Sequence, residues 1–247
     1  MKKWLAAALC TGLACGAGGS SVAKAQISPV GGGYLFRRKL QKGLVFNYAL
    51  STVIQAKGLP KMPSGPDMSN QKMTTSMKMT ILDVVGSKAK MAIETTELMM
   101  NGQKMSEARR IESEITERGQ VVESVTGGRM NPSEEIEYPE KPLKVGDVVP
   151  IKLKQLGSSN IRFIGFKPYK GKDAALWQML LSLSSDDIKN KKKTKKPTPK
   201  QKITGVINLL ISKEDGWPLS TTVTMDVSVQ AGEQPITAKT VATIVRQ

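Results

Sequence analysis

The side chains that most often perform catalysis are scarce in this chain. Its 247 residues contain no histidine, and the two cysteines, Cys10 and Cys15, both lie near the N-terminus. Histidine is the commonest metal ligand and a frequent general base, and cysteine enzymes depend on a reactive thiolate. No glycine-rich phosphate-binding loop follows a predicted strand and opens a helix. The sequence therefore predicts a protein that is not an enzyme and uses neither a cofactor nor a metal.

One acidic patch remains as a candidate for acid–base chemistry. Paired carboxylates can exchange protons when burial raises the pKa of one of them. All the members of this patch have polar or charged neighbours, including Arg109 and Arg110, so we expect a solvated face with cross-strand ion pairs instead. The carboxylates are Glu107, Glu112, Glu114, Glu117 and Glu123.

A second set of residues favours apolar binding. Methionine and isoleucine alternate with polar residues in two neighbouring segments, so one sheet face would gather them. Methionine is flexible and polarizable, so such a surface can adapt to a lipid-like or other apolar guest. An ordinary core filled with methionine explains the same pattern, whereas a thioether copper site has no histidine to support it. The candidate residues are Met73, Met77, Met79, Ile81, Met91 and Ile93.

A lysine-rich run between residues 186 and 200 is the third candidate site. Its like charges cannot pack together, and Pro197 and Pro199 interrupt it, so we expect a disordered loop between two strands. It could contact an anionic membrane or a cell-wall polymer, or simply remain solvated. No aromatic residue interleaves the lysines, so sequence-specific recognition of nucleic acid is not expected. The candidate residues are Lys189, Lys191, Lys192, Lys193, Lys195, Lys196 and Lys200.

The first 25 residues have the form of a secretory signal peptide. A basic start precedes the apolar Leu5–Gly19, and Ala23–Ala25 has the small-x-small pattern of a cleavage site. Gly12–Cys15 loosely resembles a bacterial lipoprotein cleavage site, so Cys15 is an alternative position for a lipid anchor. We therefore expect an exported protein that is periplasmic, envelope-associated or extracellular.

The elements that must position these residues are predicted to be antiparallel strands. Ser220 to Gln230 alternates between valine or methionine and polar residues, which is typical of a strand with one wet face. Asp215–Gly216 and Asn101–Gly102 predict tight turns. Gln103 to Glu117 fits both helical and strand spacing, and its hairpin context favours a strand. Pro150 must lie at an edge or bulge, since it cannot donate to a ladder.

A strand followed by two hairpins occurs twice along the chain. We divide it into a flexible leader over residues 26–33, a first β half over 34–126, a glycine- and proline-rich connector over 127–142, and a second β half over 143–247. The pattern predicts an all-β, mainly antiparallel fold with an internal duplication, built as a curved sheet, half-barrel or sandwich. Whether the halves form one sheet or two packed units is left open, as is the oligomeric state.

Several of these segments together resemble a known family. The Met-rich hairpin, the run Pro139 to Asp147 and the Asp215 to Pro218 turn resemble an uncharacterised family of exported bacterial antiparallel β-proteins. That resemblance implies no activity and transfers no site residue. More distantly, the hairpin series resembles the curved sheets of lipoprotein carriers, which is a fold-level analogy only.

Two functions follow as hypotheses. The first is an exported, non-catalytic binding protein that holds a lipid-like or apolar group on the methionine surface and associates with the anionic envelope. Its net charge of +16 favours contact with anionic surfaces. The alternative is a charge-driven polyanion-binding or structural cell-surface protein with no ligand cavity.

Overall fold

The computed structural model describes residues 26–58, 69–124, 137–153, 157–184, 200–230 and 235–247. Within these ranges every regular element is a β-strand, and no helix long and apolar enough to cross a membrane occurs. The strands are β1 (Ile27–Val30), β2 (Gly33–Phe36), β3 (Val45–Lys57), β4 (Asn70–Val85), β5 (Lys88–Thr95), β6 (Leu98–Met100), β7 (Gln103–Ser106), β8 (Arg109–Thr116), β9 (Val121–Ser124), β10 (Val148–Leu153), β11 (Gly157–Tyr169), β12 (Lys172–Ser184), β13 (Lys200–Ser212), β14 (Pro218–Gln230) and β15 (Pro235–Arg246).

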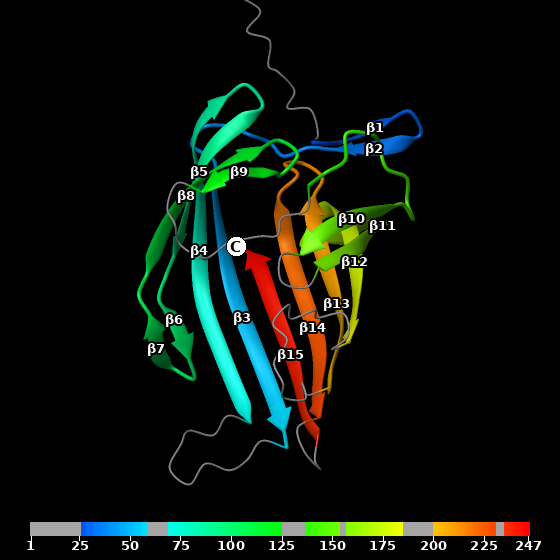
Figure 1. Ribbon diagram of the computed structural model, residues 1–247. Coiled ribbons are helices and arrows are strands. Elements are labelled where there is room, and N and C mark those ends of the chain that lie inside the picture. Colours follow the sequence, from blue (N-terminus) through cyan, green and yellow to red (C-terminus); the bar gives the residue numbers. More distant parts are fainter. Residues whose placement is uncertain (1–25, 59–68, 125–136, 154–156, 185–199, 231–234) are drawn as a thin grey trace, which may run out of the picture.

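Thirteen of these described strands form one antiparallel sheet. Its order is β10-β11-β12-β13-β14-β15-β3-β4-β5-β8-β9, and β6 pairs with β4 and β7. The pairing of β15 with β3 joins the two sequence halves, so they build one sheet rather than two packed units (Figure 1). β9 and β10 are unclosed edges within the described part of the chain, so the sheet is not a barrel. The all-β, antiparallel prediction is confirmed, whereas the duplication stays a prediction.

Local turn chemistry explains the hairpins. Asn101 and Gly102 both have positive φ, 49° and 84°, as the tight turn between β6 and β7 requires. The segment after this turn, which the sequence left between helix and strand, forms β7 and β8. Pro150 lies on the edge strand β10, where its missing N–H breaks no interior ladder.

Cross-strand register assigns each side chain of the central strands to one of two faces. Residues that are Cα partners share a face, and neighbours along a strand point to opposite faces. We call the face that carries Phe46, Tyr48 and Trp177 the inner face. It holds two buried clusters, one around Phe163 and Trp177 and one around Phe46 and Met91.

A cap of segments outside the main sheet covers one end of the inner face. It is formed by residues 26–44 and 137–147, and Figure 1 shows β1 and β2 lying across the ends of the long central strands. Phe36 packs edge-on against Phe163 and Trp177, with ring centroids 5.1 and 4.9 Å away. We call this the capped end. The open end is where β3 ends and β13 begins.

The structure corrects the predicted flexible leader at residues 26–33. Ile27 is fully buried within the first cluster, and its N–H donates to the carbonyl of Lys213 over 3.2 Å. The glycines that suggested flexibility form the turn between β1 and β2, where Gly31 and Gly32 have φ of 56° and 77°. Burial of Ile27 depends on distant strands, so the local glycine content could not reveal it.

Candidate functional site

Most of the predicted methionine surface belongs to the interior. Met79 pairs with Ile93 and Ile81 pairs with Met91, so these four side chains do share the inner face. All four are buried in the second cluster. The two remaining members, Met77 and Met73, are only partly buried and lie further towards the open end. A ligand on this face could therefore contact Met73 and Met77, while the other four fill the core.

The other predicted sites lie largely outside the described residues. Lys189, Lys191, Lys192, Lys193, Lys195 and Lys196 are not described, nor are Cys15 and the rest of the predicted signal peptide. Lys200 is the first residue of β13 and is exposed. The predicted anionic contact and lipidation therefore stay predictions.

The acidic patch forms ion pairs rather than an acid–base site. The Glu112 carboxylate lies 2.9 Å from the Lys90 ammonium and 3.1 Å from the Arg110 guanidinium. The hydrogen bond from Lys90, followed by that from Arg110, holds the pKa of the Glu112 carboxyl below its usual range. Glu117 and Glu107 pair with Arg37 and Lys104. An ionised carboxylate has no proton to donate. The ion pair between Lys90 of β5 and Glu112 of β8 instead stabilises the pairing of the two strands.

The inner face beyond the cap is uncharged, partly exposed and mainly aliphatic, with threonines such as Thr52 and Thr240 among its members. Successive rows of Cα partners run from β12 across β13, β14, β15 and β3 to β4. We call its partly buried aliphatic members the open apolar face. They include Leu50, Ile54, Met73, Leu183, Ile203, Ile207, Val223, Met225, Val227, Ala242 and Ile244.

The open apolar face carries no charged side chain among the described residues between the cap and the strand ends. The charged residues of these strand segments alternate to the outer face, as the register requires. The first charge met on the inner face is Arg246, which pairs with Asp215 over 2.9 Å at the capped end. Strict segregation of charge to one face is the pattern of a sheet whose other face contacts apolar material.

This face is continuous with the core, yet no described element lies over it. Ile207 and Met225 pack against the first buried cluster, and Leu50 and Ile244 pack against the second. Beyond the cap, the described strands that form it pair only with their neighbours in the sheet. A partly exposed, mainly aliphatic surface of this kind typically marks a binding site.

Met225 lies near the centre of the open apolar face. Its cross-strand partner is Gly205, where an added Cβ would lie 3.0 Å from the Met225 Cγ and 2.6 Å from the carbonyl oxygen of Thr224. Glycine thus lets the methionine side chain lie against the β13 backbone. Because methionine is unbranched and adaptable, this position can adjust to the shape of a bound chain.

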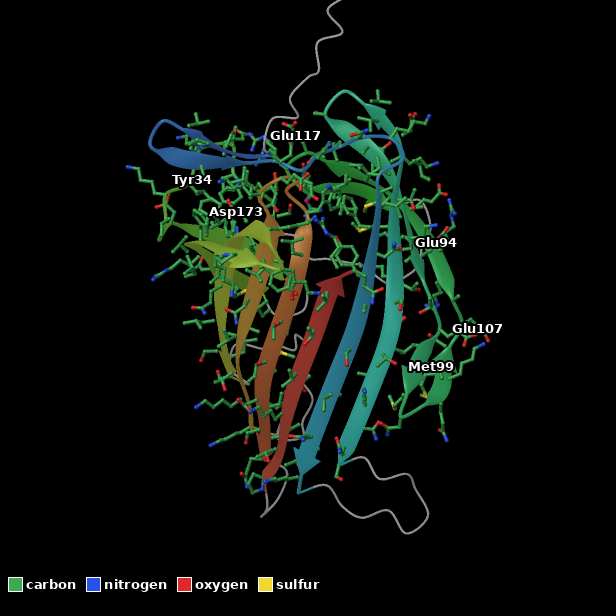
Figure 2. All side chains as sticks on the ribbon, turned by 180° about the vertical axis from the view of Figure 1, so that it is seen from behind. Tyr34, Glu94, Met99, Glu107, Glu117 and Asp173 are labelled. Atoms are coloured by element: carbon green, nitrogen blue, oxygen red, sulfur yellow. The ribbon has the colours of Figure 1, made fainter. Side chains whose placement is uncertain are left out.

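A hollow of about 530 Å³ lies mainly on the outer face of the same strands. Met99 of β6 lines one flank of it (Figure 2). Several hydroxyl groups line it, and Thr96 Oγ1 accepts a hydrogen bond from the backbone N–H of Ser76 over 2.9 Å. The side chains that line it include Ser51, Thr74, Ser76, Thr96, Thr243, Lys72 and Glu97. Ala49, Leu50, Met99 and Val245 add apolar surface to the same lining.

Neither face holds a recognisable metal centre within the described residues. No group of three or more cysteine, aspartate or glutamate side chains comes close enough there to hold an ion.

The fold and the two faces of the main sheet define a protein built on an open antiparallel β-sheet. The sheet is capped at one end and mainly apolar on one face. No family model and no curated protein matches the chain, so the resemblance to an uncharacterised family stays a prediction. A solved structure described as lipid–protein interactions in lipovitellin is similar, with a TM-score of 0.40 and 11% sequence identity. The similarity covers 85% of this chain and 25% of that one, so this chain spans about a quarter of its length.

Proposed function

We propose that this protein binds an acyl chain or comparable apolar group on the open apolar face, without catalysis. The observation that carries the proposal is the uncharged, partly exposed aliphatic surface that continues from the core across six strands. At about 4.8 Å between neighbouring strands, this surface is about 24 Å wide. It is wide enough for a long hydrocarbon chain to lie across it.

The binding energy would come from removing apolar surface from water. Each buried methylene contributes about 0.8 kcal/mol, so about ten contacting methylenes supply about 8 kcal/mol before the entropic costs of association. The predicted signal peptide supports this proposal, because an exported protein would meet membrane lipids. The alternative of a purely charge-driven polyanion binder gives no reason for an uncharged inner face.

Two neighbouring substitutions on β14 test the proposal. Val223 and Thr222 are both partly buried, but Val223 faces the open apolar surface and Thr222 faces outward. We expect Val223→Lys to weaken binding of cis-parinaric acid at least about tenfold, because it places a charge where the chain lies. Thr222→Lys should leave the affinity within about threefold of the original protein.

Circular dichroism and thermal unfolding would verify that both variants fold. Equal losses in the two folded variants, or no fluorescence change when the unsubstituted protein is titrated with the probe, would contradict the proposed function.

A further inference from the structure

Four lysines gather on the outer face at the open end of the sheet. Lys57 and Lys202 lie in one row of cross-strand partners, which passes through Ser228 and Thr237. Lys239 lies one row further from the strand ends, and Lys200 begins β13. All four side chains are exposed. The described end of the molecule opposite the cap is thus basic.

These lysines differ in their partners from those cations at the capped end that form ion pairs. Among the described residues, no hydrogen bond or ion pair reaches the ammonium groups of the four lysines. The acid in the same rows is Asp226, which is the cross-strand partner of Lys239. At the capped end, by contrast, Lys213 pairs with Asp173 over 3.5 Å and Arg37 pairs with Glu117 over 3.2 Å. Figure 2 shows Asp173 and Glu117 at that end. Within the described chain, the open end therefore presents exposed lysines that are not in ion pairs, as the capped end also does at Lys88, Lys144, Lys167 and Lys172.

We infer that the open end docks on an anionic phospholipid bilayer, with Lys57, Lys200, Lys202 and Lys239 contacting lipid phosphates. This inference rests on the proposed function, because it supplies the route by which an acyl ligand arrives. Lysines close to an anionic membrane surface are attracted to it, and their long side chains let the charge reach beyond the strand ends.

The open apolar face begins at the same end of the sheet. One of its rows near this end contains Leu183, Ile203 and Val227, and Ile203 lies next to Lys202 on β13. A protein docked by its lysines would therefore bring the edge of its apolar face to the bilayer surface. An acyl chain could then move from the membrane onto the sheet with little exposure to water, which lowers the barrier to transfer.

The test is vesicle sedimentation with variants matched in charge. One variant replaces Lys57, Lys200, Lys202 and Lys239 with glutamine. The control replaces four exposed lysines at the capped end with glutamine, and these are Lys88, Lys144, Lys167 and Lys172. Vesicles consist of phosphatidylcholine alone or of phosphatidylcholine mixed with phosphatidylglycerol. Binding of cis-parinaric acid in solution is measured for each variant.

We expect the unsubstituted protein to sediment with the anionic vesicles, and salt to weaken this binding. The open-end variant should lose at least about tenfold in partitioning, and the control less than about threefold. Equal losses in both variants would overturn the inference, since net charge alone would then explain binding. It would also be overturned if the protein bound inorganic polyphosphate but not anionic vesicles. Unchanged parinaric acid binding in these cases would show that only the docking inference has failed.

Discussion

At the scale of single residues, Gly216 fixes the cap to the central strands. Its backbone has φ of 71°, and a Cβ at this position would lie 1.8 Å from the carbonyl oxygen of Arg37. The Gly216 carbonyl also accepts a hydrogen bond from the Tyr138 hydroxyl over 2.9 Å. Next to it, buried Trp217 donates from Nε1 to the carbonyl of Lys39 over 2.9 Å. Both cap segments thus meet at the β13–β14 turn.

Gly216→Ala should therefore destabilise the protein far more than an alanine at an ordinary turn glycine. We expect a loss of more than about 4 kcal/mol in the free energy of unfolding, because the cap must move away from the turn. Gly102 provides the control, since its φ is 84° and a Cβ added there would have no neighbouring atom within 4 Å. Gly102→Ala should cost only about 1–2 kcal/mol. Urea unfolding measures both, and similar losses would contradict this role of Gly216.

The sequence predicted the turn at Gly216 but not the contact that makes it essential. Asp215–Gly216 is a local signal, and the structure confirms it as the β13–β14 turn. The approach of Arg37 joins residues far apart in sequence, and no local pattern reports it. The same limit applies to Tyr138, which the sequence assigned to a connector and the structure buries between Phe36 and Trp177. The available signal for its burial was that Tyr138 is a lone aromatic residue in a proline-rich segment.

At the scale of elements, alternation predicted most strands and their faces. Met79, Ile81, Met91 and Ile93 share a face as predicted. Whether that face is covered depends on where the cap lies, which strand periodicity does not encode. For the same reason the open apolar face was not identified. The signal for it was present in β14, where valine and methionine alternate with polar residues as regularly as methionine does in β4.

The pairing of β5 with β8 has a testable pH dependence. Lys90 and Arg110 hold the pKa of the Glu112 carboxyl below its usual range, so it is lower in the folded than in the unfolded protein. The ion pair therefore stabilises the fold above the unfolded-state pKa, and this contribution is lost as pH falls through the folded-state pKa.

A double-mutant cycle of Glu112→Gln and Lys90→Gln, followed by thermal unfolding, measures this contribution. We expect a small favourable coupling at pH 7, because the pair is solvent-accessible. The coupling should disappear in acid once Glu112 is protonated. A coupling of equal size at both pH values would show that charge is not its source.

At the scale of the whole molecule, the sheet order brings the two functional features together. β15 pairs with β3, so the C-terminal strand joins the sequence halves and makes the apolar rows continuous from β12 to β4. Strand propensity predicted an antiparallel all-β protein, but not this pairing, because many orders satisfy the same alternation. The long-range pairing creates both the extended inner face and the basic open end.

The measurement that tests the central claim most directly is methyl NMR with a spin-labelled fatty acid. Methyl-bearing residues of both faces occur on β3, β13 and β15, so the inner probes have outer controls on the same strands. The inner probes are Ile54, Ile203, Ile207 and Ile244, and the outer controls are Val53, Val206, Val241 and Val245. We predict strong paramagnetic broadening of the inner isoleucines and little broadening of the outer valines. Equal broadening on both faces, or broadening confined to the outer valines, would contradict binding on the open apolar face.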